Sequence, residues 1–298
     1  MQILVHIGLN KCGSTFIQNA LDHARSTLRA ADCWYPVQDG PPCQYGLSKA
    51  YGFGPDAPEV VPQDLSALID TAYAHRCNKL ILSSEYFSLQ RPKAATRLWN
   101  DLKTRSDSVH VVVFSREVFG WVRSLFNQYV KAVEGPGQLD DLNAFIDQTL
   151  SNRALDLAAR IGMWRNLVPE GSFHHYRLGP HLDRSATLGV FETFAGLTVE
   201  MESPDAGNDS IAPAALHRIG QLRRRLPSPD RDAEITRLLT GGASPYPAPS
   251  GFLEISPAHR ARLIREIIAP YLTLPESPLP ASDHALPTET QHRVTEPG

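Results

Sequence analysis

The sequence has little of several features that would identify a class of protein at once. Its 298 residues include four cysteines, Cys12, Cys33, Cys43 and Cys77, with no CxxC pair and no histidines at metal-ligand spacing beside them. This pattern excludes a small disulfide-stapled scaffold and predicts no metal site. We expect four reduced thiols in a cytoplasmic protein, and two disulfides in a secreted protein are the alternative.

The chain also lacks an excess of charge and any long apolar run. Its 29 Lys and Arg residues stand against 32 Asp and Glu residues, a formal net charge of −3. No bulk attraction for nucleic acid follows, so an anionic ligand would be bound by a local group of donors. No run reaches the roughly 18 apolar residues of a membrane span. Ile3–Leu9 is too short for a signal-peptide core and is predicted to be a strand.

In the first half of the chain, apolar runs alternate with segments of helical periodicity. The runs at 79–84 and 110–115 are almost continuously apolar, as in strands of a parallel sheet covered on both faces. Strands are predicted at 2–8, 79–84, 110–115 and 172–177, and helices at 16–28, 65–73 and 118–133. The alternation predicts an α/β fold of three layers, with a mostly parallel central sheet flanked by helices.

The second half is predicted to be mostly helical. Apolar stripes run along 155–167, 188–197, 216–226 and 263–272, and no linker divides two self-sufficient halves. We expect one domain over residues 1–274. Residues 275–298, with five prolines and few large apolar side chains, are predicted to form a disordered tail.

The segment Gly8–Thr15, with the sequence Gly-Leu-Asn-Lys-Cys-Gly-Ser-Thr, joins the first strand to the first helix. Backbone N–H groups at a helix start, the charge of Lys11 and two hydroxyls form a cradle for phosphate or sulfate. The segment is not a Walker A loop, in which Lys directly precedes Ser or Thr. The structural alternative is a turn in which Ser14 or Thr15 caps the helix, which leaves Lys11 unexplained.

Residues 5–15, Val-His-Ile-Gly-Leu-Asn-Lys-Cys-Gly-Ser-Thr, resemble the phosphosulfate-binding loop of the sulfotransferase superfamily, whose bacterial members often read HIGxxKTGTT there. That family implies a P-loop-like fold and the donor 3′-phosphoadenosine 5′-phosphosulfate. Cys12 departs from the usual Thr, which removes one hydroxyl contact but leaves a backbone N–H. The resemblance implies that the phosphosulfate is bound by Lys11, Cys12, Gly13, Ser14 and Thr15.

A second motif fits the same family, which binds the 3′-phosphate with an Arg at a strand end and a Ser eight residues later. Arg116 follows the strand at 110–115, and Ser124 lies eight residues on. Arg116 offers a rigid fork of donors, and Ser124 adds a hydroxyl from the adjacent helix. Taken separately, Arg116 is equally explained by an ion pair with Glu117, and Ser124 by a solvent-facing position.

Glu85 directly follows the strand at 79–84, at the edge where an open α/β sheet binds its ligands. It occupies a place similar to the catalytic His of cytosolic sulfotransferases, and we predict it to be the general base. Its alternative roles are to cap the next helix or to pair with a basic side chain. An acidic residue after an apolar strand also suggests a Mg²⁺-dependent kinase, but that function needs Ser or Thr beside Lys11.

Several other residues have structural interpretations. His6 is predicted to be a buried core histidine, His174 and His175 to point to opposite faces of a strand, and Arg223–Arg225 to form a solvated helix face. Residues 37–63 and 241–251 are candidate lids over an acceptor pocket.

The sequence as a whole predicts a metal-independent sulfotransferase that acts on a small-molecule or carbohydrate hydroxyl or amine and releases 3′-phosphoadenosine 5′-phosphate. Lys11 and Glu85 are its candidate catalytic residues. The alternative is a binding or regulatory protein that kept the nucleotide site without transfer.

Overall fold

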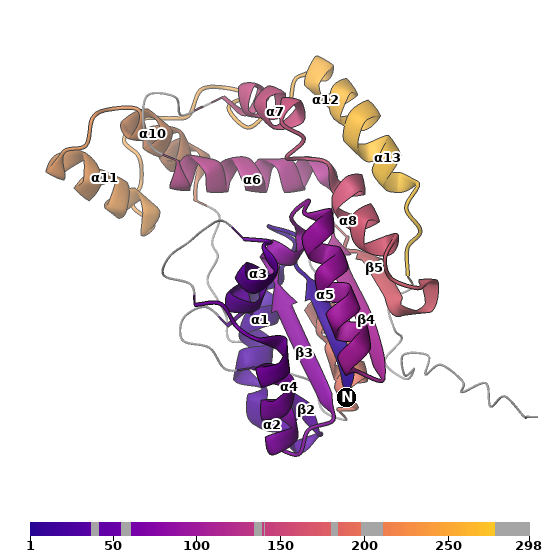
Figure 1. Ribbon diagram of the computed structural model, residues 1–298. Helices are drawn as coiled ribbons and strands as arrows, with labels where there is room; N and C mark the ends of the chain where they lie inside the picture. The colour runs from indigo at the N-terminus through magenta and orange to yellow at the C-terminus, as the bar shows by residue number, and fades with distance from the viewer. Residues whose placement is uncertain are drawn as a thin grey trace, which may run out of the picture. The chain divides into compact units, whose positions relative to one another are not determined.

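A computed structural model describes residues 1–36, 42–54, 61–133, 139, 141–179, 184–197 and 211–277 (Figure 1). The chain divides into two compact units. The first combines Met1–Ser115, Arg160–Ala206 and Glu276–Gly298, and the second combines Arg116–Ala159 and Gly207–Pro275. Of the predicted tail, residues 278–298 lie outside the described part of the chain.

The first unit is built on a parallel sheet of five strands in the order β2-β3-β1-β4-β5. The strands are β1 (Gln2–Ile7), β2 (Cys33–Trp34), β3 (Lys79–Ser84), β4 (Ser108–Ser115) and β5 (Phe173–Arg177). Ile7 is in register with Ser84, and Ser115 with Arg177. Since all strands are parallel, their carboxyl ends meet at one edge.

Helices cover both faces of this sheet, which confirms the predicted three-layer α/β fold (Figure 1). On one face, Ile17, Leu21 and Phe191 pack with Leu4 and Phe114 of the central strands. The helical elements of this unit are α1 (Ser14–His23), α2 (Arg25–Ala30), α3 (Tyr45–Tyr51), α4 (Leu65–Ala74), η1 (Glu85–Ser88), α5 (Pro92–Arg105), α8 (Leu157–Arg165), η2 (Glu170–Ser172) and α9 (Arg184–Ala195). The boundary between the units falls within α8, at Ala159.

The described part of the second unit is helical. Its elements are α6 (Val118–Ala132), α7 (Leu142–Ser151), α10 (Pro213–Arg223), α11 (Pro229–Leu239), α12 (Pro257–Leu263), the π-helical turn η3 (Ile264–Ile268) and α13 (Ala269–Leu272). Phe126 packs against Phe145 and Phe252, with ring centroids 5.5 and 5.9 Å apart. The π turn precedes Pro270, which has no N–H to donate and would crowd the carbonyl four residues earlier in a regular helix.

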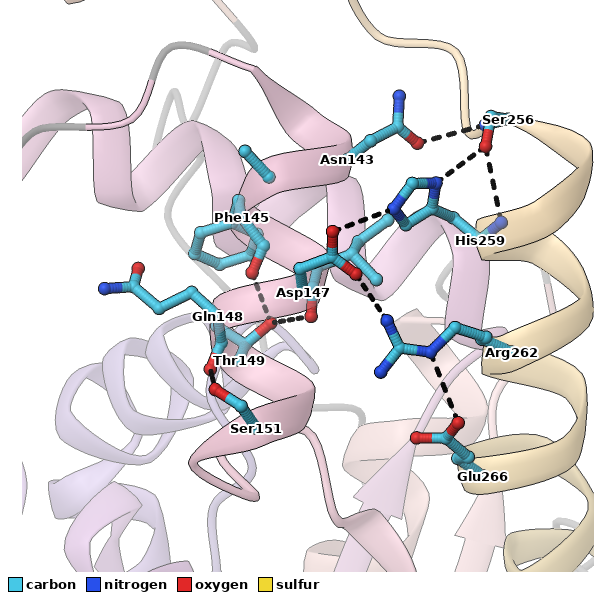
Figure 2. A network of polar contacts seen from close by, with 12 residues as sticks. Asn143, Phe145, Asp147, Gln148, Thr149, Ser151, Ser256, His259, Arg262 and Glu266 are labelled. Carbon is cyan, nitrogen blue, oxygen red and sulfur yellow. Dashed lines mark hydrogen bonds and ion pairs between the residues drawn. The ribbon is translucent and has the colours of Figure 1, made fainter.

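A polar network joins α7 to α12 in this unit (Figure 2). Asp147 accepts a hydrogen bond from Arg262 and lies 3.2 Å from Nε2 of His259. Ser256 Oγ lies 2.6 Å from Nδ1 of His259 and accepts the backbone N–H of the same residue at 3.3 Å. This Ser-His-Asp order resembles a hydrolase triad, but the hydroxyl caps α12 and the carboxylate pairs with Arg262. The network therefore stabilises the contact between two helices.

Candidate active site

The loop between β1 and α1 reverses the chain with two left-handed residues, Lys11 at φ 64° and Gly13 at φ 87°. The N–H of Cys12 donates to the carbonyl of Leu9 at 3.1 Å, and the buried hydroxyl of Ser14 donates to the same oxygen at 3.1 Å. These two bonds close a tight turn in front of α1. Cys12 is buried, so its thiol and its N–H shape the turn.

Helix α1 begins at Ser14 after Gly13, which has no side chain with which to cap it. The interpretation in which Ser14 or Thr15 caps the helix is therefore wrong, because Gly13 occupies the cap position. Thr15 is exposed in the first turn. A helix that begins without a side-chain acceptor presents its positive end to any anion in the loop.

Gly8 brings this loop against the end of β3. Its N–H donates to the carbonyl of Ser84 at 3.0 Å. A Cβ on Gly8 would lie 2.6 Å from Oγ of Ser14 and 3.3 Å from Cα of Glu85. Only glycine fits this close approach without displacing a neighbour. The sequence-predicted loop and Glu85 are therefore adjacent in the first unit.

Glu85 is half-buried at the start of η1. Burial raises the pKa of its carboxyl, and the charge of Lys11 opposes that rise. The turn that follows is capped by Ser84, whose Oγ accepts the N–H of Tyr86 at 3.3 Å, so the alternative in which Glu85 caps this helix is wrong. Lys11 and Glu85, predicted from separate segments, lie within electrostatic reach of one another.

Two residues before and within α3 lie near enough to Glu85 to feel its charge, and sequence reasoning missed both. Burial raises the pKa of Cys43 to about 12, and the charge of Glu85 adds to the rise. Tyr45 donates its hydroxyl to the Cys43 sulfur, and its pKa is raised by burial, with Glu85 again contributing. The Tyr45 ring stacks on Tyr86, with centroids 4.5 Å apart and planes at 23°. A thiol and a phenol, both protonated, thus lie close to the Glu85 carboxylate.

Arg116 and Ser124 lie in the second unit, where the structure places them at the start of α6 and two turns into it. The Glu117 carboxylate accepts the N–H groups of Phe119 at 2.7 Å and Gly120 at 2.6 Å. A Cβ on Gly120 would lie 3.5 Å from Nη2 of Arg116, so the guanidinium lies over this first turn. Because Glu117 already caps α6, an anion here would be bound by the two side chains, not by the helix end.

The remaining predicted residues have structural roles. His6 is buried, its Nδ1 lies 2.8 Å from Oγ of Ser83, and burial lowers its pKa to about 3, as expected for a core histidine. His174 and His175 bond to different partners, His110 and Ser115. Arg223 is only 8% exposed, so the prediction of a solvated face is wrong at this position, where α10 packs within its unit.

Metal binding and membrane crossing would each need features that can be recognised among the described residues. Those residues include no group of three or more His, Cys, Asp or Glu side chains that could hold a metal ion. Among the helices they form, none is both long and apolar enough to cross a membrane. All four cysteines are buried free thiols. The predicted lid at 37–63 is described only at 42–54 and 61–63.

No protein-family model matches the chain, and no curated protein matches it. Among solved structures, a sulfotransferase from Alicyclobacillus acidocaldarius is similar, with a TM-score of 0.45 and 12% sequence identity over 80% of this chain and 94% of that one. At this score and identity, the likeness carries no argument about chemistry, which depends on the site itself.

Proposed function

We propose that this chain is a sulfotransferase that moves the sulfuryl group of 3′-phosphoadenosine 5′-phosphosulfate to an acceptor hydroxyl or amine. One observation carries the proposal. A loop with the motif of a phosphosulfate cradle, containing Lys11, is packed through Gly8 against a half-buried Glu85 at the carboxyl edge of a parallel sheet. An anion site and a base of raised pKa, side by side, are what this transfer requires.

The residues of the loop fit the phosphosulfate end of such a donor. The first turn of α1 has no side-chain cap, Lys11 supplies a cation, and Thr15 is exposed. In the proposed assignment, Lys11, Gly13, Ser14 and Thr15 hold the phosphosulfate, and Cys12 shapes the turn. Arg116 and Ser124 would bind the 3′-phosphate, where the rigid guanidinium matches phosphate geometry.

The donor, when bound, supplies an activated sulfuryl group. The chain contributes a base and a positive charge. Glu85 would accept the proton that the acceptor hydroxyl loses as its oxygen bonds to sulfur. Lys11 would neutralise the charge that builds on the departing phosphate oxygen. Transfer of this kind has a loose transition state, so positioning and charge stabilisation supply most of the acceleration. The acceptor would be a small molecule or a carbohydrate.

Binding of adenosine 3′,5′-bisphosphate, the desulfated product, tests the donor assignment directly. Isothermal titration of the full chain is expected to show binding in the presence of EDTA, since no metal takes part in the proposed site. Lys11→Ala should weaken binding about tenfold or more, because a charged contact contributes about 1.5–3 kcal/mol. Lys103→Ala, an equal change of charge on the exposed side of α5, is the matched control.

Three results separate the proposal from its alternatives. Absence of bisphosphate binding, or binding that EDTA abolishes, would refute the donor assignment. Transfer of labelled sulfate from the donor to any hydroxyl compound would exclude a protein that only binds the nucleotide. Bisphosphate binding with no transfer across a broad panel of phenols, sugars and amines would favour the binding protein instead.

A further inference from the structure

A cluster of polar side chains lies buried near the carboxyl edge of the sheet, where β1 and β3 end. Each member is at most 5% exposed. They come from β1, α1, β3, the residue before α3 and α3 itself, and they are His6, Gln18, Gln44, Ser48, Ser83 and Ser84. We call this set the buried polar cluster. Buried polar groups cost free energy unless they are hydrogen-bonded, so each contact in the cluster has to be accounted for.

The first part of the cluster ties α1 and α3 to β3. Nε2 of Gln18 donates to Oγ of Ser83 at 3.1 Å. The backbone N–H of Gln44 donates to the Ser83 carbonyl at 2.8 Å, and the Ser83 N–H donates to Oε1 of Gln44. The helix that follows the anion loop and the helix that carries Tyr45 are therefore both fixed to the same residue of β3.

The second part of the cluster leads to Glu85. The hydroxyls of Ser48 and Ser84 are 2.7 Å apart and share a hydrogen bond, and Ser48 also bonds to the Gln44 carbonyl at 3.0 Å. Ser84 Oγ in turn caps the short turn η1, whose first residue is Glu85. One buried hydroxyl in α3 thus holds the hydroxyl that sets the backbone direction at Glu85.

We propose that Ser48, acting through Ser84, is a positioning residue that holds Glu85 toward the anion loop. The inference rests on the proposed role of Glu85 as the base. Replacing both members of a buried hydrogen-bonded pair by apolar groups is often nearly neutral for stability. The two hydroxyls are therefore not explained by stability alone. Phe87 and Ser88 anchor the later half of the turn Glu85–Ser88 in the core, whereas the contacts of the two hydroxyls converge on its first half, where Glu85 lies.

The groups that face Glu85 come from three elements. Lys11 of the loop opposes the rise of its pKa, while Cys43 and Tyr45 from the start of α3 are protonated neighbours, and Tyr86 lies on the same turn. If the turn Glu85–Ser88 changes its direction, the Glu85 carboxylate becomes more exposed to water and moves away from these groups. The titration of Glu85 therefore reports its position.

The experiment follows the Glu85 carboxyl carbon by NMR in the full chain, labelled with ¹³C-glutamate and assigned with Glu85→Gln. In Ser48→Ala, the titration midpoint of Glu85 is expected to fall toward the ordinary glutamate range. Thr149→Val is the matched control, since Thr149 has a buried hydroxyl that bonds within α7 to the Phe145 carbonyl at 2.7 Å. In Thr149→Val, the titration midpoint of Glu85 should equal that in the unmodified chain.

A double variant, Ser48→Ala with Ser84→Ala, guards against a single variant that fails to fold. It leaves neither hydroxyl without its partner and also removes the acceptor of the Tyr86 N–H, so the Glu85 midpoint should fall at least as far as in the single variant. In a transfer assay, both should lower turnover by about 10- to 100-fold, the scale of a misplaced catalytic group, with bisphosphate affinity unchanged.

An unchanged Glu85 midpoint in a folded Ser48 variant, single or double, would overturn the positioning role. Failure of the proposed function would be recognised separately. If Glu85→Gln transfers sulfate at the full rate, or the chain binds no bisphosphate, the base or the donor is misassigned. The NMR titration would still decide whether Ser48 holds Glu85.

Discussion

Substitution of Gly8 by alanine tests the geometry on which the proposed site depends. The added Cβ would lie 2.6 Å from Oγ of Ser14, 3.1 Å from its Cβ and 3.3 Å from Cα of Glu85. Ordinary van der Waals contact begins at 3.4 Å, so the serine oxygen would have to retreat by 3.4 − 2.6, about 0.8 Å. It cannot rotate away freely, because it is buried and bonded to the Leu9 carbonyl.

The expected cost follows from these contacts. Overpacking of a well-filled site costs about 1–3 kcal/mol, and loss of the Ser14 hydrogen bond adds about 1 kcal/mol. A destabilisation of about 2–4 kcal/mol lowers the unfolding midpoint by roughly 4–16 °C in a domain of 150–250 residues. The shift also moves the start of α1, so we expect the affinity for adenosine 3′,5′-bisphosphate to fall by about tenfold or more, the equivalent of one charged contact.

Thermal unfolding and isothermal titration measure the two effects, with Gly162→Ala as the control. Gly162 lies within α8, and a Cβ there would meet nothing within 4 Å. Alanine in place of a helical glycine is expected to stabilise by about 0.5–1 kcal/mol and to leave bisphosphate binding unchanged. A Gly8→Ala protein with unchanged midpoint and unchanged affinity would mean that the loop and Glu85 do not approach as closely as described.

Three further outcomes are expected. Arg116→Ala should weaken binding of the bisphosphate far more than that of adenosine 5′-phosphosulfate, which has no 3′-phosphate; equal losses in titrations would show that the role of Arg116 is misassigned. Glu85→Gln should raise the thermal midpoint at pH 7. Burial raises the pKa of the Glu85 carboxyl, so the folded protein loses stability as the pH rises through the titration of this group, and glutamine removes that loss. That gain should vanish in scans at pH 4 or below, and a gain that persisted there would have another cause. A chain ending at 277 should keep the thermal midpoint of the full chain, whereas one ending at 274 should unfold at a lower temperature. The reason is that Glu276 lies 3.5 Å from Arg177 and Ser277 bonds to the backbone of His175 on β5. Equal midpoints would show that these contacts contribute nothing.

The strands of the sheet could be predicted because they carry their own signal. β3 matches the prediction at both ends, and β4 begins two residues earlier than expected. Buried parallel strands are apolar on both faces, which leaves an uninterrupted run in the sequence. β2 was missed because its two residues, Cys33 and Trp34, are too short for any period to show.

Two helices of the first unit show where such reasoning stops. α5 could have been found, since Pro92 stands at its start and Ala94, Leu98 and Leu102 recur at helical spacing among charged residues. α3 could not, because its buried residues include Gly46, which lies against Val61 and Gln63, and Ser48, which bonds to Ser84 of β3, and neither burial follows from hydropathy.

The candidate site divides in the same way. Lys11 and Glu85 could be predicted because each follows a strand, and parallel strands bring such positions to one edge. Cys43 and Tyr45 could not be predicted, since they precede or begin helix α3, which the sequence pattern does not indicate. The closure of the loop by Ser14 was also unpredictable, because a hydroxyl near a helix start is usually interpreted as a cap.

Binding of the donor would change the pKa of Glu85. Lys11 is the basic group whose charge opposes the rise of the Glu85 pKa, and the same lysine belongs to the proposed anion loop. A nucleotide that brings several negative charges to that loop would engage Lys11 and set like charge beside the carboxylate. Both effects raise the pKa of Glu85 further, and a carboxylate of higher pKa is a stronger base. Donor binding would therefore prepare the base for the acceptor, and the acid limb of kcat should lie at higher pH than that of kcat/KM. Coincident limbs would show that the loop and Glu85 are electrostatically independent.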